Sequence, residues 1–364
     1  MTLHIFNPEH DIALASGLAN FTAPHAGRLL RHDLGYLPAL WAEPGDMVLV
    51  DDPEYAMQAL RKLSARLFRA GLKRISVDDS ITFHPIRQDL PSSVAISRVQ
   101  PWGWNSALRA LLLRRGVNSR LLPADEQLEQ VRNLSHRRTS AQLLPLLREQ
   151  GTVGESVECT SVEQVEEAVR RFSKVILKAP WSSSGRGLRF VDDQQFTVGS
   201  QHVAGWLRNI LATQGSVMAE PYYNKVKDFG MEFHSDGKGT VCYLGLSLFQ
   251  TQNGAYIGNV LATETAKETL LSQYVSPSLL QTVRQLICRE LGTLFCGKYQ
   301  GPFGVDMMIT SATNGFMLHP CVEINLRRTM GHTALTLSPS DADLWRVMRI
   351  DFNENAYTMR ILRR

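Results

Sequence analysis

Residues 174–187 read KVILKAPWSSSGRG, and this stretch decides the fold into which the rest of the chain must fit. The apolar run that ends at Lys178 predicts a strand, and the serines and glycines after it predict a turn. Such a turn offers hydroxyl groups and flexible backbone N–H groups beside a lysine ammonium, all of which suit a phosphate. The chain has no GxxxxGK[ST] sequence, so this is not a Walker A loop. A surface hairpin without a ligand is the alternative.

A second group of polar residues lies further along the chain, in the segments GVDMMIT and CVEIN. Asp306 stands among apolar residues of a strand pattern, and Glu323 and Asn325 share one face of the next strand because side chains alternate along a strand. A buried carboxylate is costly unless it is paired or bound to a metal. Three oxygen ligands on two neighbouring strands suit Mg²⁺. The alternative is that they pair with nearby arginines such as Arg327 and Arg328.

The first 120 or so residues alternate between strand and helix patterns. Strands are predicted at 3–6, 47–51 and 73–77, and helices at 54–70 and 105–115. Alternation of this kind predicts a parallel α/β sheet.

From about residue 134 the pattern changes to α+β. Helices are predicted at 137–150, 162–172, 201–214 and 278–295, and strands at 155–159, 174–178, 216–220, 304–309 and 316–325, with further β-type segments up to 259. Residues 160–163, TSVE, have the spacing of a capping box at the start of the second of these helices.

The order of these segments resembles the ATP-grasp superfamily. The resemblance covers roughly residues 130–335, through VILKAPWSSSGRGL, VMAEPYY, FGVDMMI and VEINLRRTMGH, of which the last two are similar to the metal-binding strands of D-alanine–D-alanine ligase and biotin carboxylase. It implies an α/β, Rossmann-like pre-ATP-grasp domain over residues 1–125, followed by an α+β ATP-grasp fold. That fold would have an N-terminal lobe over 126–215 and a C-terminal lobe with the metal site over 216–364.

The resemblance also implies which residues bind the nucleotide. Lys178 and Arg138 would contact phosphates, with Arg138, or alternatively Arg137, in the place of a lysine that the family carries on the first helix of the fold. The loop over the terminal phosphates would consist of Ser182, Ser183, Ser184, Gly185, Arg186 and Gly187. The hinge that holds the adenine would consist of Glu220, Pro221, Tyr222 and Tyr223. Asp228, or alternatively Glu232, would bind the ribose.

The metal ligands implied by the resemblance are Asp306, Glu323 and Asn325. Arg327 and Arg328, together with Lys178, would stabilise the charge of the transferring phosphoryl group. Many ligases of the family carry an arginine where this chain has Gly304, so the later arginines would have to supply that charge.

A function follows from the resemblance as an expectation. The cofactors would be ATP and Mg²⁺, with Mn²⁺ as an alternative ion. The chain would be a ligase that activates a small-molecule or peptide carboxylate as an acyl phosphate, which an amine or a thiol then attacks. A phosphotransferase (kinase) and a nucleotide-binding regulatory protein without turnover are the alternatives, and a homodimer stays open.

The N-terminal unit carries polar residues directly after its first predicted strand, in NPEHDIALA, which begins at Asn7. Because α/β sheets bind ligands at the carboxyl ends of their strands, Glu9, His10 and Asp11 are candidates for ligand contact. The alternative is a polar loop in which Asp11 caps the next helix. The tryptophans of QPWGWN (100–105) could likewise stack on a ligand or pack in the core.

Composition excludes several other classes of protein. The chain has 364 residues, of which 44% are hydrophobic and 20% charged, the balance of a soluble protein with more than one domain. The net charge of +4 is spread over small basic clusters, which does not indicate a nucleic-acid partner. The sequence contains no apolar run of about 18 residues that would cross a membrane. Five cysteines without a CxxC pair, and an N-terminus unlike a signal peptide, predict a cytoplasmic protein.

Overall fold

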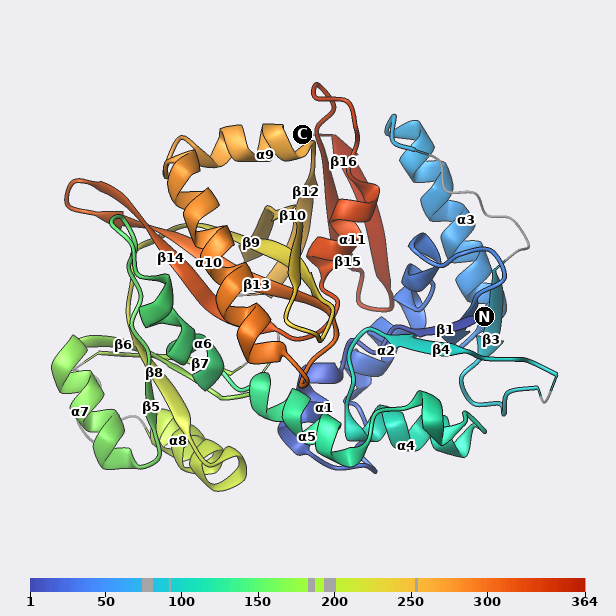
Figure 1. The fold of residues 1–364 in the computed structure, drawn as a ribbon, viewed down its shortest axis with the longest axis horizontal. Helices are drawn as coiled ribbons and strands as arrows, with labels where there is room; N and C mark the ends of the chain where they lie inside the picture. Colours follow the sequence, from blue (N-terminus) through green and yellow to red (C-terminus); the bar gives the residue numbers. More distant parts are fainter. Residues whose placement is uncertain (74–80, 92, 183–186, 193–200, 253–254, 364) are drawn as a thin grey trace.

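The computed structural model describes residues 1–73, 81–91, 93–182, 187–192, 201–252 and 255–363. Within these ranges the strands form four sheets of four strands each (Figure 1). None of the helices in these ranges is long and apolar enough to cross a membrane. The four sheets agree with an α/β unit followed by an α+β unit, whereas the domain boundaries near residues 125 and 215 stay predictions.

The N-terminal sheet is parallel, in the order β3-β2-β1-β4. Its strands are β1 Thr2–Ile5, β2 Met47–Val50, β3 Thr82–Pro85 and β4 Arg98–Pro101. The helices around it are α1 His10–Ser16, α2 His25–Leu34, η1 Leu37–Leu40, α3 Pro53–Arg69, α4 Ser106–Arg114, η2 Ser119–Leu121 and α5 Asp125–Leu134. The predicted parallel sheet is confirmed, and the candidate strand at 73–77 lies outside the described residues from position 74 onward.

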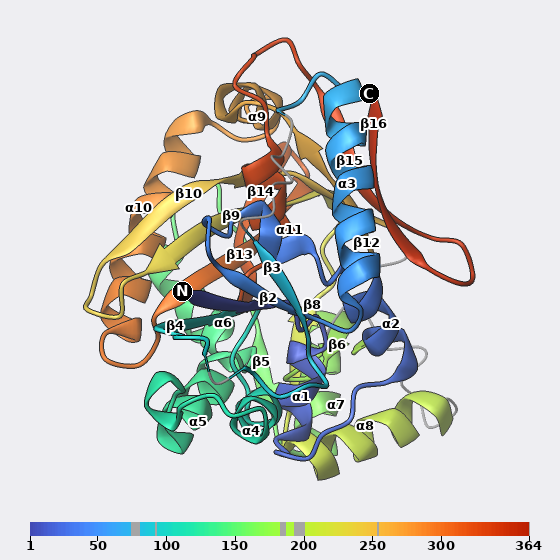
Figure 2. The same ribbon diagram turned by 90° about the vertical axis from the view of Figure 1, so that its right-hand side faces the viewer.

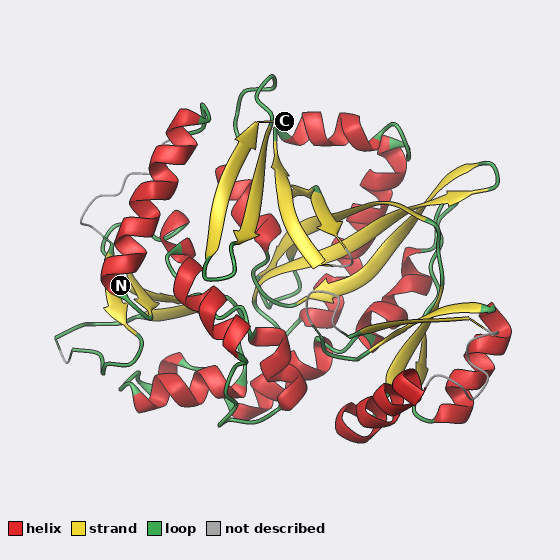
Figure 3. Ribbon diagram, turned by 180° about the vertical axis from the view of Figure 1, so that it is seen from behind, coloured by secondary structure: helices red, strands yellow, loops and turns green. Residues whose placement is uncertain are grey.

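The small sheet is antiparallel, in the order β5-β8-β6-β7, and it forms a separate corner of the molecule (Figure 3). Its strands are β5 Val157–Cys159, β6 Lys174–Lys178, β7 Leu188–Asp192 and β8 Val217–Pro221, and its helices are α7 Val162–Phe172 and α8 Gln201–Gln214. Val175 and Leu177 pack in one core with residues of both helices. Because side chains alternate along a strand, Lys178 points to the opposite face.

Two local predictions in this region were wrong in detail. The helix predicted at 137–150 is divided into α6 Arg138–Leu143 and the short η3 Leu144–Leu147, because Pro145 has no N–H to continue an α-helix. The cap of α7 lies one residue later than predicted. Ser161 accepts a hydrogen bond from the N–H of Gln164, and the side chain of Gln164 accepts one from the N–H of Thr160.

The large sheet is also antiparallel, in the order β10-β9-β13-β14. Its strands are β9 Lys225–Ser235, β10 Val241–Ser247, β13 Gly301–Ala312 and β14 Gly315–Asn325. One face carries Phe229, Phe233 and Val305, which pack in a common core with residues of α10 Pro277–Phe295. The register therefore leaves Asp306 and its neighbours on the other face of the sheet.

A fourth sheet, in the order β11-β12-β15-β16, lies beside α3 of the N-terminal unit (Figure 2). Its strands are β11 Phe249–Gln252, β12 Ala255–Leu261, β15 Arg346–Phe352 and β16 Tyr357–Arg363, and the helices nearby are α9 Glu264–Leu271 and α11 Met330–Leu337. Leu67 of α3 shares a core with Met348 and Met359, and Arg66 donates a hydrogen bond to the carbonyl of Met359. The C-terminal strands thus join the first and last parts of the chain.

Candidate functional site

Lys178 and Glu220 form a buried ion pair on the face of the small sheet that points away from its helices. Nζ of Lys178 lies 2.5 Å from Oε2 of Glu220, and the two side chains are only 6% and 8% exposed. The pair forms because β6 and β8 are neighbours, with Ile176 opposite Glu220 and Lys178 opposite Met218. The hydroxyl of Ser156 donates a hydrogen bond to the other oxygen of Glu220, over 3.3 Å. The lysine ammonium is therefore fixed at a defined place rather than mobile in solvent.

Asp306 and Glu323 lie directly opposite each other on β13 and β14, and Gly304 lies opposite Asn325. Nδ2 of Asn325 donates a hydrogen bond to Oδ2 of Asp306 over 3.1 Å. A Cβ at Gly304 would lie 2.7 Å from the carboxylate of Glu232, so no arginine fits there without movement of that group. The three expected metal ligands thus share one face of the large sheet.

The electrostatics of these carboxyl groups favour a cation. Burial, together with the neighbouring charges of Glu323 and Glu232, raises the pKa of Asp306 to about 8. Burial also raises the pKa of Glu323 above its usual range, although Arg137 opposes this. A divalent ion would offset the repulsion between the carboxylates, so the donors fit Mg²⁺. Among the described residues, no group of three His, Cys, Asp or Glu side chains could hold a metal, so phosphate oxygens or water would have to complete the coordination.

Arg137 links the small sheet to the large one. Its Nη2 lies 2.8 Å from Oε1 of Glu323 and donates a hydrogen bond to the hydroxyl of Ser182, while its Nε donates to the carbonyl of Ala179. We call the group formed by Arg137, Lys178, Glu220, Asp306, Glu323 and Asn325 the inter-sheet site. The loop positions Ser183, Ser184, Gly185 and Arg186 lie outside the described residues.

Arg138, the arginine that the sequence favoured for phosphate contact, lies elsewhere. Its Nη2 is 3.6 Å from Oε1 of Glu158, and its side chain is 44% exposed. Successive residues of a helix point about 100° apart, so only one of the two neighbouring arginines can face the inter-sheet site. The structure brings Arg137 to that site and leaves Arg138 at the surface.

This difference gives a direct prediction for nucleotide binding. Arg137→Gln should weaken binding of Mg-ATP by roughly tenfold or more, because a charge-assisted hydrogen bond contributes about 1.5–3 kcal/mol. Arg138→Gln is the matched control and should change the affinity by less than about twofold, as for an exposed ion pair. Both dissociation constants can be measured by calorimetric titration. A larger loss in the Arg138 variant would contradict the assignment.

Arg327 is held by a residue of the N-terminal unit. Its Nε and Nη2 lie 2.9 and 2.8 Å from the two carboxylate oxygens of Asp11, and Nη2 also donates a hydrogen bond to Oδ1 of Asn325. Burial alone would raise the pKa of Asp11, but the attraction of Arg327 outweighs it, so the pKa lies below its usual range. The alternative in which Asp11 caps the next helix does not hold, because Glu9 occupies the N-cap position of α1. Asp11 instead fixes a guanidinium beside the expected metal ligands.

Arg328 does not join this group. Its guanidinium carbon lies 4.3 Å from the ring centroid of Trp41, and its backbone N–H donates to the carbonyl of Trp102. Burial lowers the pKa of Arg328 to about 10. The tryptophan of QPWGWN at position 102 is buried in the core. Arg328 therefore contacts the N-terminal unit rather than the inter-sheet site.

The residues expected to bind adenine and ribose lie at the end of β8, in the connection from β8 to β9, and on β9 itself. Tyr222 donates its N–H to the carbonyl of Lys174, and the ring of Tyr223 packs edge-on against His319. Asp228 accepts hydrogen bonds from Lys225 and Thr251.

Glu232, the alternative ribose ligand, is fully enclosed. Only 3% of it is exposed, and its carboxylate lies 2.9 Å from Nδ1 of His332. Asp228 is more accessible, and we therefore prefer it for the ribose.

His319 lies in the same region, but it was not among the candidate site residues that the sequence indicated. It is buried on β14, neither ring nitrogen has a hydrogen-bond partner among the described residues, and burial lowers its pKa to about 4. The charges of Glu220 and Lys178 act on it. A single histidine in a strand pattern carries no spacing signal, since a buried histidine more often serves packing alone.

The raised pKa of Asp306 predicts a pH dependence. A metal ligand must be deprotonated, so Mg²⁺ should bind more tightly as pH rises toward about 8 and should release a proton when it binds at neutral pH. In the metal-free protein the folded state holds this proton more tightly than the unfolded state does. The free energy of unfolding should therefore fall as pH rises from the usual Asp value of 3.8 to about 8. Titrations in buffers of different ionisation enthalpy measure the proton release. Asp306→Asn should remove it, and release that persists in this variant would contradict the prediction.

Comparisons with known proteins identify the fold. No family model and no curated protein matches the sequence. Among solved structures, N5-carboxyaminoimidazole synthetase from Staphylococcus aureus, complexed with ADP, is 14% identical with a TM-score of 0.50, over 97% of this chain and 83% of that one. Biotin carboxylase from Campylobacter jejuni is 12% identical with a TM-score of 0.52, over 98% and 77%. The biotin carboxylase domain of the Hydrogenobacter thermophilus 2-oxoglutarate carboxylase, solved with MgADP and bicarbonate, is 14% identical with a TM-score of 0.52, over 85% and 75%.

Proposed function

The chain has an ATP-grasp fold, and on that premise we propose that it binds Mg-ATP at the inter-sheet site and uses it to activate a carboxylate. The observation that carries the proposal is the position of Arg137, which contacts both Glu323 of the large sheet and the turn that follows Lys178. Two cations and three carboxylates are thereby brought together between the two sheets. Such a group suits a polyphosphate with its metal ion.

The proposed residue roles follow from the geometry. Lys178 and Arg137 would hold phosphate oxygens, and Arg327, fixed by Asp11, would neutralise charge on the transferring group. Mg²⁺, when bound, would be held by Asp306, Glu323 and Asn325 and would neutralise the phosphate oxygens. The backbone of the hinge at 220–223 would lie along the adenine. Asp228 would accept a hydrogen bond from the ribose.

In the proposed reaction, phosphorylation makes the substrate carboxylate, which is a poor electrophile, reactive. A carboxylate oxygen of the substrate attacks the γ-phosphorus of ATP, the bond to the β–γ bridging oxygen breaks, and ADP leaves. The resulting acyl phosphate is then attacked at its carbonyl carbon by an amine or a thiol, which loses a proton as inorganic phosphate departs. The protein contributes position and charge neutralisation.

The test is a screen of small carboxylates, each with and without amines and thiols, for substrate-dependent release of ADP. For an active pair, a carboxylate labelled with oxygen-18 should transfer one labelled oxygen to inorganic phosphate. A phosphorylated product with no free phosphate would instead identify a phosphotransferase. Binding of Mg-ATP without any ADP release across the screen would favour a regulatory protein and would contradict the proposal.

A further inference from the structure

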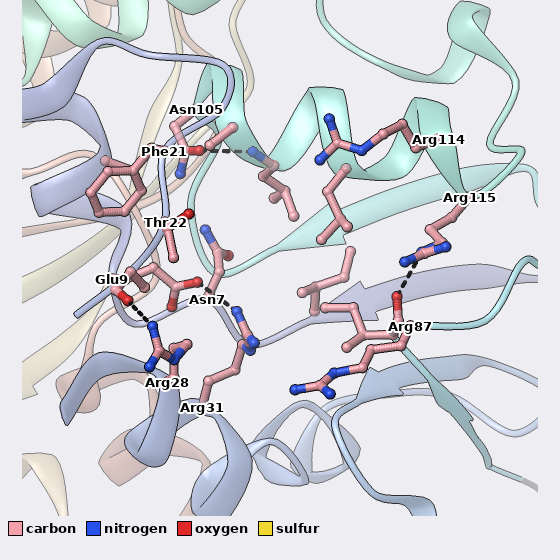
Figure 4. A pocket seen from close by; sticks show the side chains of 17 residues that line it. Asn7, Glu9, Phe21, Thr22, Arg28, Arg31, Arg87, Asn105, Arg114 and Arg115 are labelled. Atoms are coloured by element: carbon pink, nitrogen blue, oxygen red, sulfur yellow. Dashed lines mark hydrogen bonds and ion pairs between the residues drawn. The ribbon is translucent and has the colours of Figure 1, made fainter. Parts of the chain in front are cut away.

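A cavity of about 230 Å³ lies in the N-terminal unit, at the carboxyl end of the parallel sheet (Figure 4). The last residue of β1 and the residue that follows β3 both line it, and the loops after β1 and β4 contribute Asn7 and Asn105. Ligands of α/β sheets bind at this end, where the strands leave the sheet and the loops diverge. The cavity is thus placed where a ligand is expected, and it is distinct from the inter-sheet site.

Five arginines line the cavity, and they approach it from two sides (Figure 4). Arg28 and Arg31 come from α2, Arg87 follows β3, and Arg114 and Arg115 lie at the end of α4. Among the described residues that line the cavity, Glu9 is the one acidic residue. An anion placed here would meet positive charge on both sides.

The arginines differ in whether a carboxylate of the protein already neutralises their charge. Arg31 is paired with Asp51 and Glu9, and Arg115 contacts the carbonyl of Ile86 and the carboxylate of Asp89. Arg87 and Arg114, in contrast, form no hydrogen bond or ion pair with any residue in the described ranges. A guanidinium group that no described carboxylate neutralises is suited to bind a phosphate or a carboxylate from solution.

The remaining wall of the cavity is mostly apolar. It includes Ile5, Ala13, Phe21, Leu108 and Leu111. One carboxylate oxygen of Glu9 is buried and has no hydrogen-bond partner among the described residues. The cavity therefore combines a charged end, an apolar wall and a free carboxylate oxygen, as a small-molecule site does.

A short connection runs from the cavity to the inter-sheet site. Glu9 lines the cavity and pairs with Arg31, and Asp11, two residues later on the same turn of α1, holds Arg327 beside Asn325. The loop is itself fixed by a pair of hydrogen bonds between Asn7 and Gly103. A ligand in the cavity would thus contact the same rigid segment that positions Arg327.

We propose that this cavity binds an anionic group, a phosphate or a second carboxylate, on the apolar body of a substrate. The inference rests on the proposed function, because the anionic group in the cavity would belong to one of the two molecules that the ligase joins. The reacting carboxyl or amine lies on another part of the same molecule. The volume admits a small metabolite rather than a peptide, since drug-sized ligands occupy cavities of roughly 300–1,000 Å³.

Calorimetric titration of the full chain with phenyl phosphate and with benzoate tests the cavity itself. At least one of the two should bind, and the tighter of them identifies the anionic group as phosphate or carboxylate. The double variant Arg87→Gln/Arg114→Gln should bind it roughly tenfold or more weakly. Arg61→Gln, on the exposed side of α3, is the matched control and should bind like the wild type. Absence of binding, or equal binding to the double variant, would overturn the inference.

Titration of the same variants with Mg-ATP separates this inference from the proposed function. The Arg87/Arg114 double variant should bind Mg-ATP as the wild type does. For a substrate found through ADP release, it should raise KM by roughly tenfold or more while kcat changes little. An unchanged KM would show that the substrate binds elsewhere, even though Mg-ATP turnover is intact. If Mg-ATP itself fails to bind to the wild type, the proposed function fails instead.

Discussion

Glu323→Gln is expected to abolish ADP formation while the protein stays folded. Glu323 lies opposite Asp306 and 2.8 Å from Arg137, so it links the expected metal ligands to the turn after Lys178. The amide keeps the size of the side chain but removes the negative charge that a metal ion needs. We expect kcat to fall by about 1,000-fold or more, as when a group that acts in the transition state is removed.

Stability should not explain that loss. Burial raises the pKa of Glu323, which means that the charged form is held at a cost, and a neutral amide avoids this cost. The circular dichroism spectrum of the variant should therefore match that of the wild type. The melting temperature should stay close to the wild-type value, because Arg137 keeps its hydrogen bonds to Ala179 and Ser182 and can donate one to the amide oxygen. Glu166→Gln, on the exposed surface of α7, is the control and should keep full activity. Retained turnover in the Glu323 variant would show that the metal site lies elsewhere.

Lys178→Met should weaken binding of Mg-ATP by roughly 100-fold, equivalent to about 2.7 kcal/mol. Its ammonium is the cation that the small sheet fixes next to the Ser/Gly turn, and methionine keeps the apolar stem but not the charge. Calorimetric titration with Mg-ATP measures the loss. Lys174→Met, at the exposed start of the same strand, should bind Mg-ATP as the wild type does.

The Lys178→Met variant needs a second substitution, because loss of the lysine alone would leave Glu220 buried and unpaired. Breaking a buried ion pair costs about 3–5 kcal/mol, enough to unfold part of the population. Lys178→Met/Glu220→Gln removes both charges and should restore the melting temperature toward that of the wild type. Binding of Mg-ATP should stay weak in this folded double variant. If this double variant bound Mg-ATP with wild-type affinity, Lys178 would not be a phosphate ligand.

Local periodicity was sufficient to predict the strands on which the inter-sheet site is built. KVILK alternates so that Val175 and Leu177 pack on the helices and Lys178 does not, and this pattern is visible without a structure. The same reasoning placed Glu323 and Asn325 on one face, and the register confirms it. These predictions depended only on neighbouring residues, which is why they hold.

The sequence could not predict contacts between distant parts of the chain. The hydrogen-bonded ion pair between Asp11 and Arg327 joins residues 316 positions apart, and no local sequence pattern predicts it. The choice between Arg137 and Arg138 depends on where α6 begins, and an error of one residue turns the wrong side chain toward the site. The C-terminal strands β15 and β16 were missed because their buried face packs against α3, near the other end of the chain.

Titration with ATP in the presence and absence of Mg²⁺ tests the central claim most directly. The wild type and the double variant Asp306→Asn/Glu323→Gln are compared under the same conditions. We predict one ATP bound per chain of the wild type, with an affinity that Mg²⁺ increases by roughly tenfold or more and an increase that the double variant loses. No binding of ATP to the wild type, or the same increase with Mg²⁺ in the double variant, would contradict the inter-sheet site as the place where Mg-ATP binds.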